Sequence, residues 1–203
     1  MKNVTPQSKE QRLIRILDSS WDILSQRIAT GRVKINKEAS LQLHYSSILL
    51  AHGELLCIAP DETFLIELES ANEKKSIDIV CSLGDTKAAV ELKCFRKASS
   101  RAMDYDMYDV LCDLERLASY AGFAVRKFIC ITDNPSYVKS RHSGHAGSVT
   151  IRDGTFYNGG TIIVPSWIGA WKDSSRDRAV TLAKDVLFDW SENRGWYSLS
   201  ITL

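Results

Sequence analysis

Two carboxylates and a lysine near the middle of the chain have the residue types and the spacing of a metal-assisted hydrolytic site. Asp78 lies in the run 76–83, and Glu91 and Lys93 lie in the run 86–95. Both runs alternate polar with apolar residues, which predicts two β-strands. Glu91 and Lys93 are two residues apart, so we expect their side chains to point to the same face of their strand.

The dipeptide Gly84-Asp85 between the two runs predicts a two-residue hairpin turn. That turn would place Asp78 directly opposite Glu91, with their Cβ atoms about 5 Å apart. At an effective dielectric constant of about 20, two such carboxylates repel each other by about 3 kcal/mol, so a cation or a shared proton is needed between them. A hard divalent cation held by two carboxylates beside a lysine is chemistry suited to phosphodiester hydrolysis.

The same three residues also fit a second interpretation, the solvated face of an antiparallel hairpin in which Glu91 and Lys93 pair with neighbouring charges. The facing carboxylates, the apolar character of both strands and the helix that follows favour a functional site, because carboxylates clustered in apolar surroundings tend to mark one.

Periodicity and turn signals predict the elements that must position these residues. We expect helices at 9–30, 37–52, 104–121 and 175–190, with Asn36 as an N-cap and Gly31 and Gly122 as helix ends. We expect strands at 63–69, 76–83, 86–95, 125–132, 161–168 and 196–202, and a loop-rich segment at 133–160. Helix 104–121 is a crossover connection, so strand 125–132 should lie parallel to its sheet neighbour.

Asp78, followed by Glu91-Leu92-Lys93 on the next strand, resembles the PD-(D/E)xK nuclease superfamily, which has the restriction-endonuclease-like fold. The order helix, three strands, helix, strand over 37–132 also resembles the core of that superfamily. Ile77 stands where the motif has proline, and many members of the superfamily lack that proline.

The resemblance implies an α/β (α+β) protein with a mixed central β-sheet flanked by helices. We expect one domain, 1–203, built on a core at about 37–132. The N-terminal helix 9–30 and the C-terminal subregion 133–203 would pack on that core.

The resemblance also implies a function, a metal-dependent endonuclease that hydrolyses DNA. Asp78, Glu91 and the carbonyl of Leu92 would hold Mg²⁺, for which Mn²⁺ can substitute, and Lys93 would orient the attacking water or stabilise the developing charge. Because cutting both strands of a duplex calls for two symmetric sites, we expect a homodimer. DNA is the expected partner, and RNA stays open.

In several branches of the superfamily a glutamate on the first core helix completes the metal site. Glu38 is the candidate here, and Glu54 and Glu67 are its rivals. Glu38 also has a simpler explanation, because a carboxylate near a helix N-terminus is favoured electrostatically.

The segment from Asn134 to Arg152 contains no acidic residue but includes Lys139, Arg141 and Arg152. These three cations predict either a loop that contacts nucleic-acid phosphates or an ordinary polar loop. His142 and His145 in the same segment are a weak zinc signal, because no cysteine lies nearby. The acidic residues of helix 104–121 are expected to form a solvated face: Asp106, Asp109, Asp113 and Glu115.

Composition sets broad limits. The chain has 203 residues, 44% of them hydrophobic and 25% charged, with a net charge of +1, so total charge gives no support to nucleic-acid binding. The chain has five cysteines without a C-x-x-C pair, a polar N-terminus and no apolar run long enough for a membrane span. These features favour a cytoplasmic protein with free thiols.

One alternative function is a catalytically silent nucleic-acid-binding or assembly protein on the same scaffold. Another, an α/β enzyme acting on a small molecule, has no Gly-rich loop or nucleophile elbow to support it.

Overall fold

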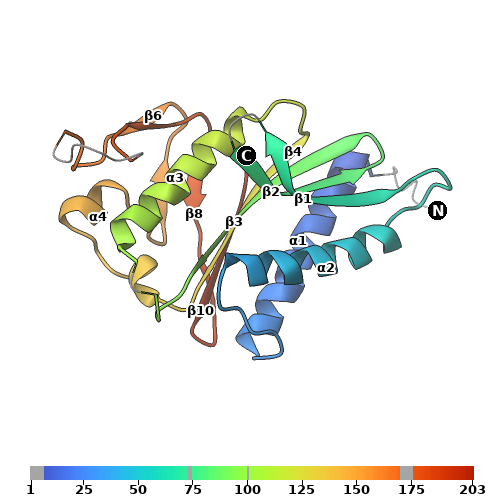
Figure 1. Ribbon diagram of the computed structural model, residues 1–203, viewed down its shortest axis with the longest axis horizontal. Coiled ribbons are helices and arrows are strands. Elements are labelled where there is room, and N and C mark those ends of the chain that lie inside the picture. The colour runs from blue at the N-terminus through green and yellow to red at the C-terminus, as the bar shows by residue number, and fades with distance from the viewer. Residues whose placement is uncertain (1–6, 73–74, 100, 170–175) are drawn as a thin grey trace, which may run out of the picture.

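The computed structural model describes residues 7–72, 75–99, 101–169 and 176–203, and it shows a mixed α/β protein (Figure 1). The helices are α1 (Lys9–Ala29), α2 (Glu38–Leu55), α3 (Met103–Ser119), α4 (Gly144–Ser148) and the 3₁₀ turn η1 (Pro135–Tyr137). The strands are β1 (Phe64–Asn72), β2 (Lys75–Leu83), β3 (Thr86–Phe95), β4 (Val125–Thr132), β5 (Thr155–Tyr157), β6 (Thr161–Ile163), β7 (Val180–Leu182), β8 (Val186–Phe188), β9 (Ser191–Asn193) and β10 (Trp196–Thr202).

Six strands form the central sheet in the order β1-β2-β3-β4-β10-β9. β3 and β4 run parallel, joined by the crossover helix α3, and the other neighbours in this sheet are antiparallel. The hairpin prediction is confirmed, since Leu83 pairs with Thr86 across the turn at Gly84 and Asp85. Gly84 has φ +61°, a left-handed conformation that glycine adopts without strain.

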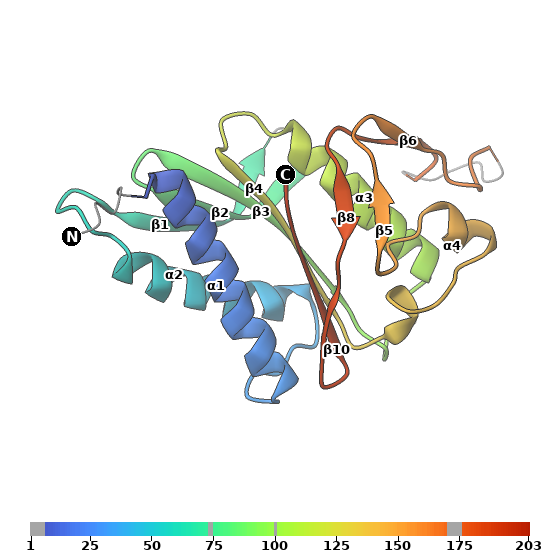
Figure 2. The same ribbon diagram turned by 180° about the vertical axis from the view of Figure 1, so that it is seen from behind.

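The two faces of the sheet are covered by different helices. α1 and α2 pack on one face, where buried residues such as Ile79, Val90 and Ile129 join the helices in one apolar cluster. α3 and the small strands of the C-terminal part pack on the other face, around Ala89 and Phe128. Figure 2, the view from behind, shows α1 crossing the sheet and the C-terminal strands β5 and β8 beside α3.

The predicted elements at 9–30, 37–52, 63–69, 76–95, 104–121, 125–132 and 196–202 are all present, with shifts of up to three residues at their ends. α2 begins after Lys37 rather than after Asn36, because the Ser40 hydroxyl accepts the backbone N–H groups of both residues, at 3.1 Å for Asn36 and 3.2 Å for Lys37. α3 ends at Ser119, ahead of Gly122, because Tyr120 is already extended. The connection between the strands predicted at 63–69 and 76–83 lies partly outside the described residues, and the strands on either side of it extend to residue 72 and from residue 75.

The helix predicted at 175–190 is wrong. The described part of that segment contains strands β7 and β8 instead, and residue 175 lies outside the description. Val180, Leu182, Val186 and Phe188 are buried while the residues between them in each strand are exposed, which is the two-residue period of strands. The spacing of Leu182 and Val186 matches a helical turn as well as it matches two short strands, which explains the error.

The predictions for the C-terminal part were too coarse in two further places. The strand expected at 161–168 is limited to β6, Thr161–Ile163, and Pro165 follows closely. The loop-rich segment 133–160 contains η1, α4 and β5. Within the described ranges, no helix combines the length and the apolar character that a membrane crossing requires.

Candidate active site

The site begins where the pairing of β2 with β3 stops. The ladder has the predicted register but ends at Ile79 opposite Val90, one residue before the expected pair of Asp78 with Glu91. Instead, the Asp78 carboxylate accepts a 2.6 Å hydrogen bond from the backbone N–H of Leu92. Gln42 on α2 donates to the Asp78 carbonyl at 2.8 Å. A carboxylate thus takes the place of a backbone carbonyl at the end of the ladder.

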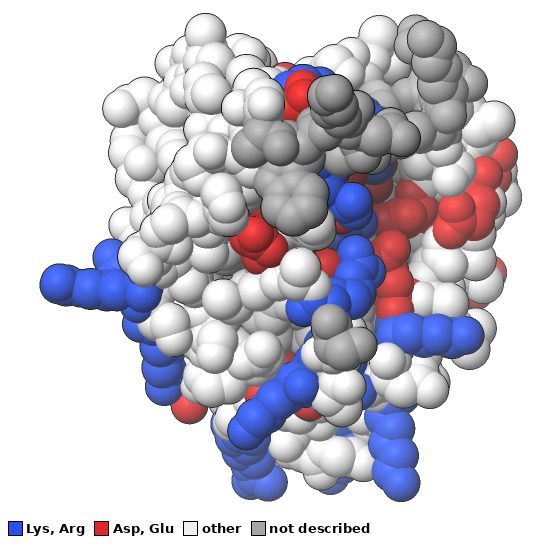
Figure 3. All heavy atoms as spheres, turned by 60° about the vertical axis from the view of Figure 1, so that its left-hand side comes forward, with Lys and Arg blue, Asp and Glu red and all other residues white. Residues whose placement is uncertain are grey.

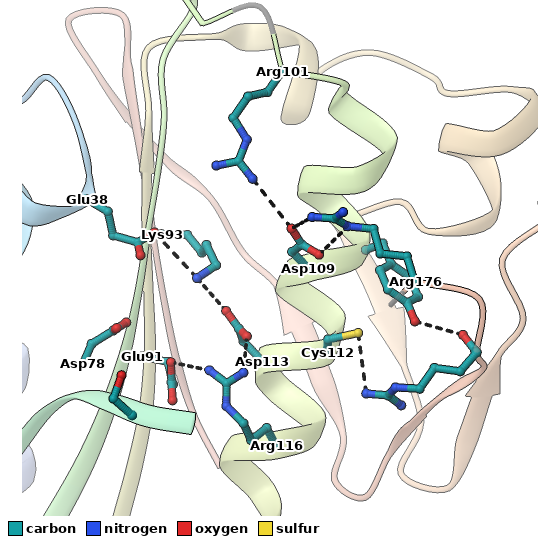
Figure 4. Close-up of a pocket in the computed structure, with 13 residues that line it drawn as sticks. Glu38, Asp78, Glu91, Lys93, Arg101, Asp109, Cys112, Asp113, Arg116 and Arg176 are labelled. Carbon is teal, nitrogen blue, oxygen red and sulfur yellow. Dashed lines mark hydrogen bonds and ion pairs between the residues drawn. The ribbon is translucent and has the colours of Figure 1, made fainter. Parts of the chain in front are cut away.

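Asp78 and Glu91 line one pocket of about 900 Å³ together with Lys93. Residues of α2, β2, β3 and α3 and of the segment 176–178 form its walls, and Figure 4 shows side chains from these elements converging on one space. The acidic residues that line the pocket are Glu38, Asp78, Glu91, Asp109 and Asp113. The basic residues that line it are Lys93, Arg101, Arg116, Arg176 and Arg178.

Glu91 lies deep in this pocket, with 1% of its side chain exposed. Arg116 on α3 donates to Oε2 of Glu91 at 2.7 Å, and the Tyr120 hydroxyl donates to Oε1 at 2.7 Å. Arg116 also donates to the Tyr120 hydroxyl at 2.7 Å. Both oxygens of Glu91 are therefore positioned by side chains at and just beyond the end of α3.

Lys93 is held between two elements. Its Nζ lies 2.6 Å from Oδ2 of Asp113 on α3 and 3.6 Å from Oε2 of Glu38 at the start of α2. It also donates to the carbonyl of Leu92 at 3.1 Å. Asp113 completes a chain of charges, because its other oxygen lies 2.9 Å from Arg116.

Burial shifts the ionisation of these groups. It raises the pKa of Glu38 and of Asp78 above their usual values. Burial, with the nearby charges of Asp78 and Asp113, raises the pKa of Glu91 to about 7 against the opposing effect of Arg116. Burial alone would lower the pKa of Lys93, but the negative charges of Asp113 and Glu38 outweigh it and raise that pKa, so the amine stays protonated.

The structure thus brings together four residues predicted for catalysis, Asp78, Glu91, Lys93 and Glu38. Of the three glutamates considered for the fourth position, only Glu38 lines the pocket. Glu54 and Glu67 are exposed and lie outside its lining. The carbonyl of Leu92 is beside Asp78 and Lys93, as its hydrogen bonds show.

The cations predicted to contact nucleic acid lie elsewhere. Within the described ranges, Lys139, Arg141 and Arg152 are not part of the pocket lining, and Lys139 pairs with Glu192 at 2.7 Å. The two histidines of that segment have structural partners. His142 contacts the Ser136 carbonyl at 2.8 Å, and His145 contacts the Ser166 hydroxyl at 2.8 Å.

Sequence reasoning missed the contribution of α3. The expectation of a solvated acidic face is wrong for Asp106 and Asp113, which are buried. Asp113, Arg116 and Tyr120 are spaced at i, i+3 and i+7, so they share one face of a helix or its immediate extension. The sequence therefore offers one signal, an aspartate, an arginine and a tyrosine on the same side of the helix. Only the packing of α3 over β3 shows that this side faces the site.

The donor set has the chemistry that Mg²⁺ prefers. The carboxylates of Asp78 and Glu91 and the Leu92 carbonyl are hard oxygen donors, and Mg²⁺ usually takes one or two carboxylates and keeps several waters. Among the described residues, however, no group of three or more His, Cys, Asp or Glu side chains is arranged to hold a metal ion. Because Arg116 and Tyr120 already engage both oxygens of Glu91, a bound cation would have to share that carboxylate with them.

Comparisons of the chain with protein-family models, with curated proteins and with solved structures gave no match.

Proposed function

We propose that the protein is a metal-dependent nuclease that hydrolyses phosphodiester bonds of DNA in this pocket. The observation that carries the proposal is the meeting of Asp78, Glu91 and Lys93 in one cavity, with Glu91 buried and Lys93 kept as a cation. Two carboxylates beside a fixed ammonium group suit a reaction in which negative charge develops on a phosphate.

The order of elements supports the proposal. α2, β1, β2, β3, α3 and β4 follow one another as in the core of the restriction-endonuclease-like fold, and β3 and β4 are parallel. The Asp78 and Glu91-Leu92-Lys93 segments occupy β2 and β3, the strands that carry the motif in the PD-(D/E)xK superfamily. We therefore assign the protein to that superfamily as part of the proposal.

Asp78, Glu91 and the Leu92 carbonyl would hold Mg²⁺, with Glu38 as a further ligand. When bound, the ion polarises the scissile phosphate and lowers the pKa of a water. Lys93 is aimed into the pocket by Asp113 and Glu38, so it would stabilise the charge that develops on the phosphate. Arg116 and Tyr120 position Glu91 without needing to touch the substrate.

Cleavage assays with Mg²⁺ or Mn²⁺ on labelled DNA test the proposal. We expect Asp78→Ala and Lys93→Ala to lose at least about 100-fold in rate. Far-ultraviolet circular dichroism and the thermal midpoint show whether each variant is folded. Lys87→Ala is the matched control, because Lys87 lies on the same strand as Lys93 but is exposed outside the pocket. Undiminished cleavage by a folded Asp78→Ala variant would refute the assignment.

A second candidate function is a catalytically silent nucleic-acid-binding or assembly protein on the same scaffold. It is favoured by the mutual pairing of Glu91 with Arg116 and of Lys93 with Asp113, because two groups proposed for catalysis already have partners within the protein. Calorimetry with Mn²⁺ separates the two functions. An active nuclease should bind the ion and lose that binding in Asp78→Asn, whereas a silent scaffold should show no binding that depends on Asp78. The expected homodimer stays a prediction.

A further inference from the structure

Three arginines form the outer part of the pocket wall. Arg101 lies shortly before α3, and Arg176 and Arg178 lie shortly before β7. Their side chains are 60%, 32% and 50% exposed, respectively, whereas Glu91 and Asp113 on the inner side are 1% and 8% exposed. Arginines thus lie on the outer part of the wall, and buried carboxylates lie on its inner part. Figure 3 shows basic and acidic side chains meeting in one hollowed band of the surface.

Each of these arginines is oriented by a carboxylate on α3. Arg176 makes two parallel hydrogen bonds to Asp109, at 2.9 and 2.7 Å, and Arg178 lies 2.6 Å from Glu115. Arg101 lies 2.8 Å from the buried Asp106. Ion pairs of this kind fix the direction of a guanidinium group, which has five N–H donors, and Arg101 and Arg176 keep donors beyond these pairs that can bind a phosphate. Arg178 also donates to the Ala179 carbonyl at 3.0 Å and to Cys112 Sγ at 3.7 Å, so fewer of its donors remain for a phosphate. Figure 4 shows Arg101 and Arg176 converging on Asp109 from opposite sides.

The size of the pocket limits what can reach its floor. A volume of about 900 Å³ is within the range of cavities that enclose a small ligand. A DNA duplex carries its phosphates on the outside of a wide, stiff cylinder, whose major groove alone is about 12 Å across. A single strand has a flexible backbone, so one phosphate can descend to Asp78 while its neighbours stay at the mouth.

We propose that the pocket selects a single-stranded polynucleotide, whose backbone phosphates bind Arg101, Arg176 and Arg178 on either side of the phosphate that faces Asp78 and Glu91. This inference rests on the proposed nuclease function and adds the form of the substrate. It also assigns the binding of the strand to the arginine wall rather than to Lys139, Arg141 and Arg152.

Fluorescence anisotropy tests the proposal in proteins that all carry Asp78→Asn, so that cleavage does not interfere. The probes are labelled oligothymidylate, labelled oligouridylate and a DNA duplex of the same length. We expect at least one single strand to bind more tightly than the duplex, and the two single strands identify the sugar preference. Adding Arg101→Gln should weaken single-strand binding about tenfold. When Arg101→Gln and Arg176→Gln are combined, two phosphates lose their arginine partners. The slope of log affinity against log salt concentration should then become shallower by about 1.4, which is about 0.7 for each of these phosphates.

Arg15→Gln is the control, because Arg15 is an exposed arginine on α1, the helix that covers the opposite face of the sheet. It should leave the affinity unchanged. Arg101 is the most exposed of the three arginines, so Arg101→Gln keeps the test valid even if the variant at Arg176 fails to fold. Unchanged single-strand binding in a folded Arg101→Gln protein, or tighter binding of the duplex, would overturn the inference. Cleavage by the wild-type protein is measured separately, so a protein that binds single strands through these arginines but cuts nothing would contradict only the proposed function.

Discussion

The backbone N–H of Leu92 on β3 donates a 2.6 Å hydrogen bond to Oδ2 of Asp78 on β2, just beyond the last paired residues of the two strands, Ile79 and Val90. This bond replaces a rung of the ladder and holds the Asp78 carboxylate beside the strand that carries Glu91 and Lys93. The like charge of Asp78 helps to raise the pKa of Glu91, so the two carboxylates interact electrostatically. The arrangement stores repulsion that a cation would relieve.

The first prediction concerns that repulsion. Asp78→Asn keeps an oxygen that accepts the Leu92 N–H but removes the charge next to Glu91. We expect the free energy of unfolding, measured with urea in a chelating buffer, to stay the same or to rise by about 1 kcal/mol. Calorimetry should show the affinity for Mn²⁺ falling at least about tenfold. A clear fall in the free energy of unfolding of Asp78→Asn would mean that the Asp78 carboxylate stabilises the fold and is not kept to bind a cation.

The second prediction concerns Asp113, which pairs with both Lys93 and Arg116 inside the pocket. Removing one partner of a buried ion pair leaves an uncompensated charge, so Asp113→Asn should lower the free energy of unfolding by about 3 kcal/mol. Glu115→Gln is the matched control on the same helix. Its side chain is partly exposed and pairs with Arg178, so we expect a loss of less than about 1 kcal/mol. Equal losses in the two variants would contradict a special role for Asp113.

The third prediction concerns pH. Glu62 accepts hydrogen bonds from Arg12 and from the backbone N–H groups of Ile58 and Ala59, and these bonds lower its pKa from 4.5 to about 2. A carboxylate whose pKa is lower in the folded state stabilises the fold above pH 4.5 and loses that contribution as the pH falls toward 2.

Glu62→Gln should therefore unfold at a lower urea concentration than the wild type at neutral pH, and the difference should shrink between pH 4.5 and 2. Urea titrations at several pH values measure both midpoints. Asp61→Asn, a change at the exposed neighbouring carboxylate, is the control and should keep the wild-type pH dependence. A midpoint difference that stays constant with pH would show that Glu62 acts through shape rather than charge.

The fourth prediction tests the strands that replace the helix expected at 175–190. Val186 is buried and Leu187 is half exposed, as the alternation of β8 requires. Val186→Ala should lower the free energy of unfolding by about 2 kcal/mol, and Leu187→Ala should lower it by less than about 0.5 kcal/mol. Thermal and urea unfolding give both values. The reverse order would place residue 187 in the core, against the strand assignment.

The structural core of the site was predictable because its determinants are local. The alternation in 76–83 and 86–95 and the tight turn between them set the register of the hairpin, and a two-residue period then puts Glu91 and Lys93 on one face. The order of elements from α2 to β4 followed from apolar periodicity in the same way. Glu38 is the candidate that the sequence favours over Glu54 and Glu67, but the sequence alone does not decide among them, because the distance from a helix start to a strand depends on how the two pack.

Tertiary structure alone decided what surrounds those residues. An acidic helix face is solvated unless something packs over it, and only the position of α3 on the sheet shows that Asp113 and Arg116 are turned toward Lys93 and Glu91. The segment 176–178 reaches the pocket from more than sixty residues after α3 begins, and no local pattern encodes that contact. The sequence by itself determined the hairpin and the three residues that it carries, because neighbours along the chain set strand, turn and face. The tertiary structure determined which charged side chains pair with these three residues, because those partners are distant in the sequence and close only in space.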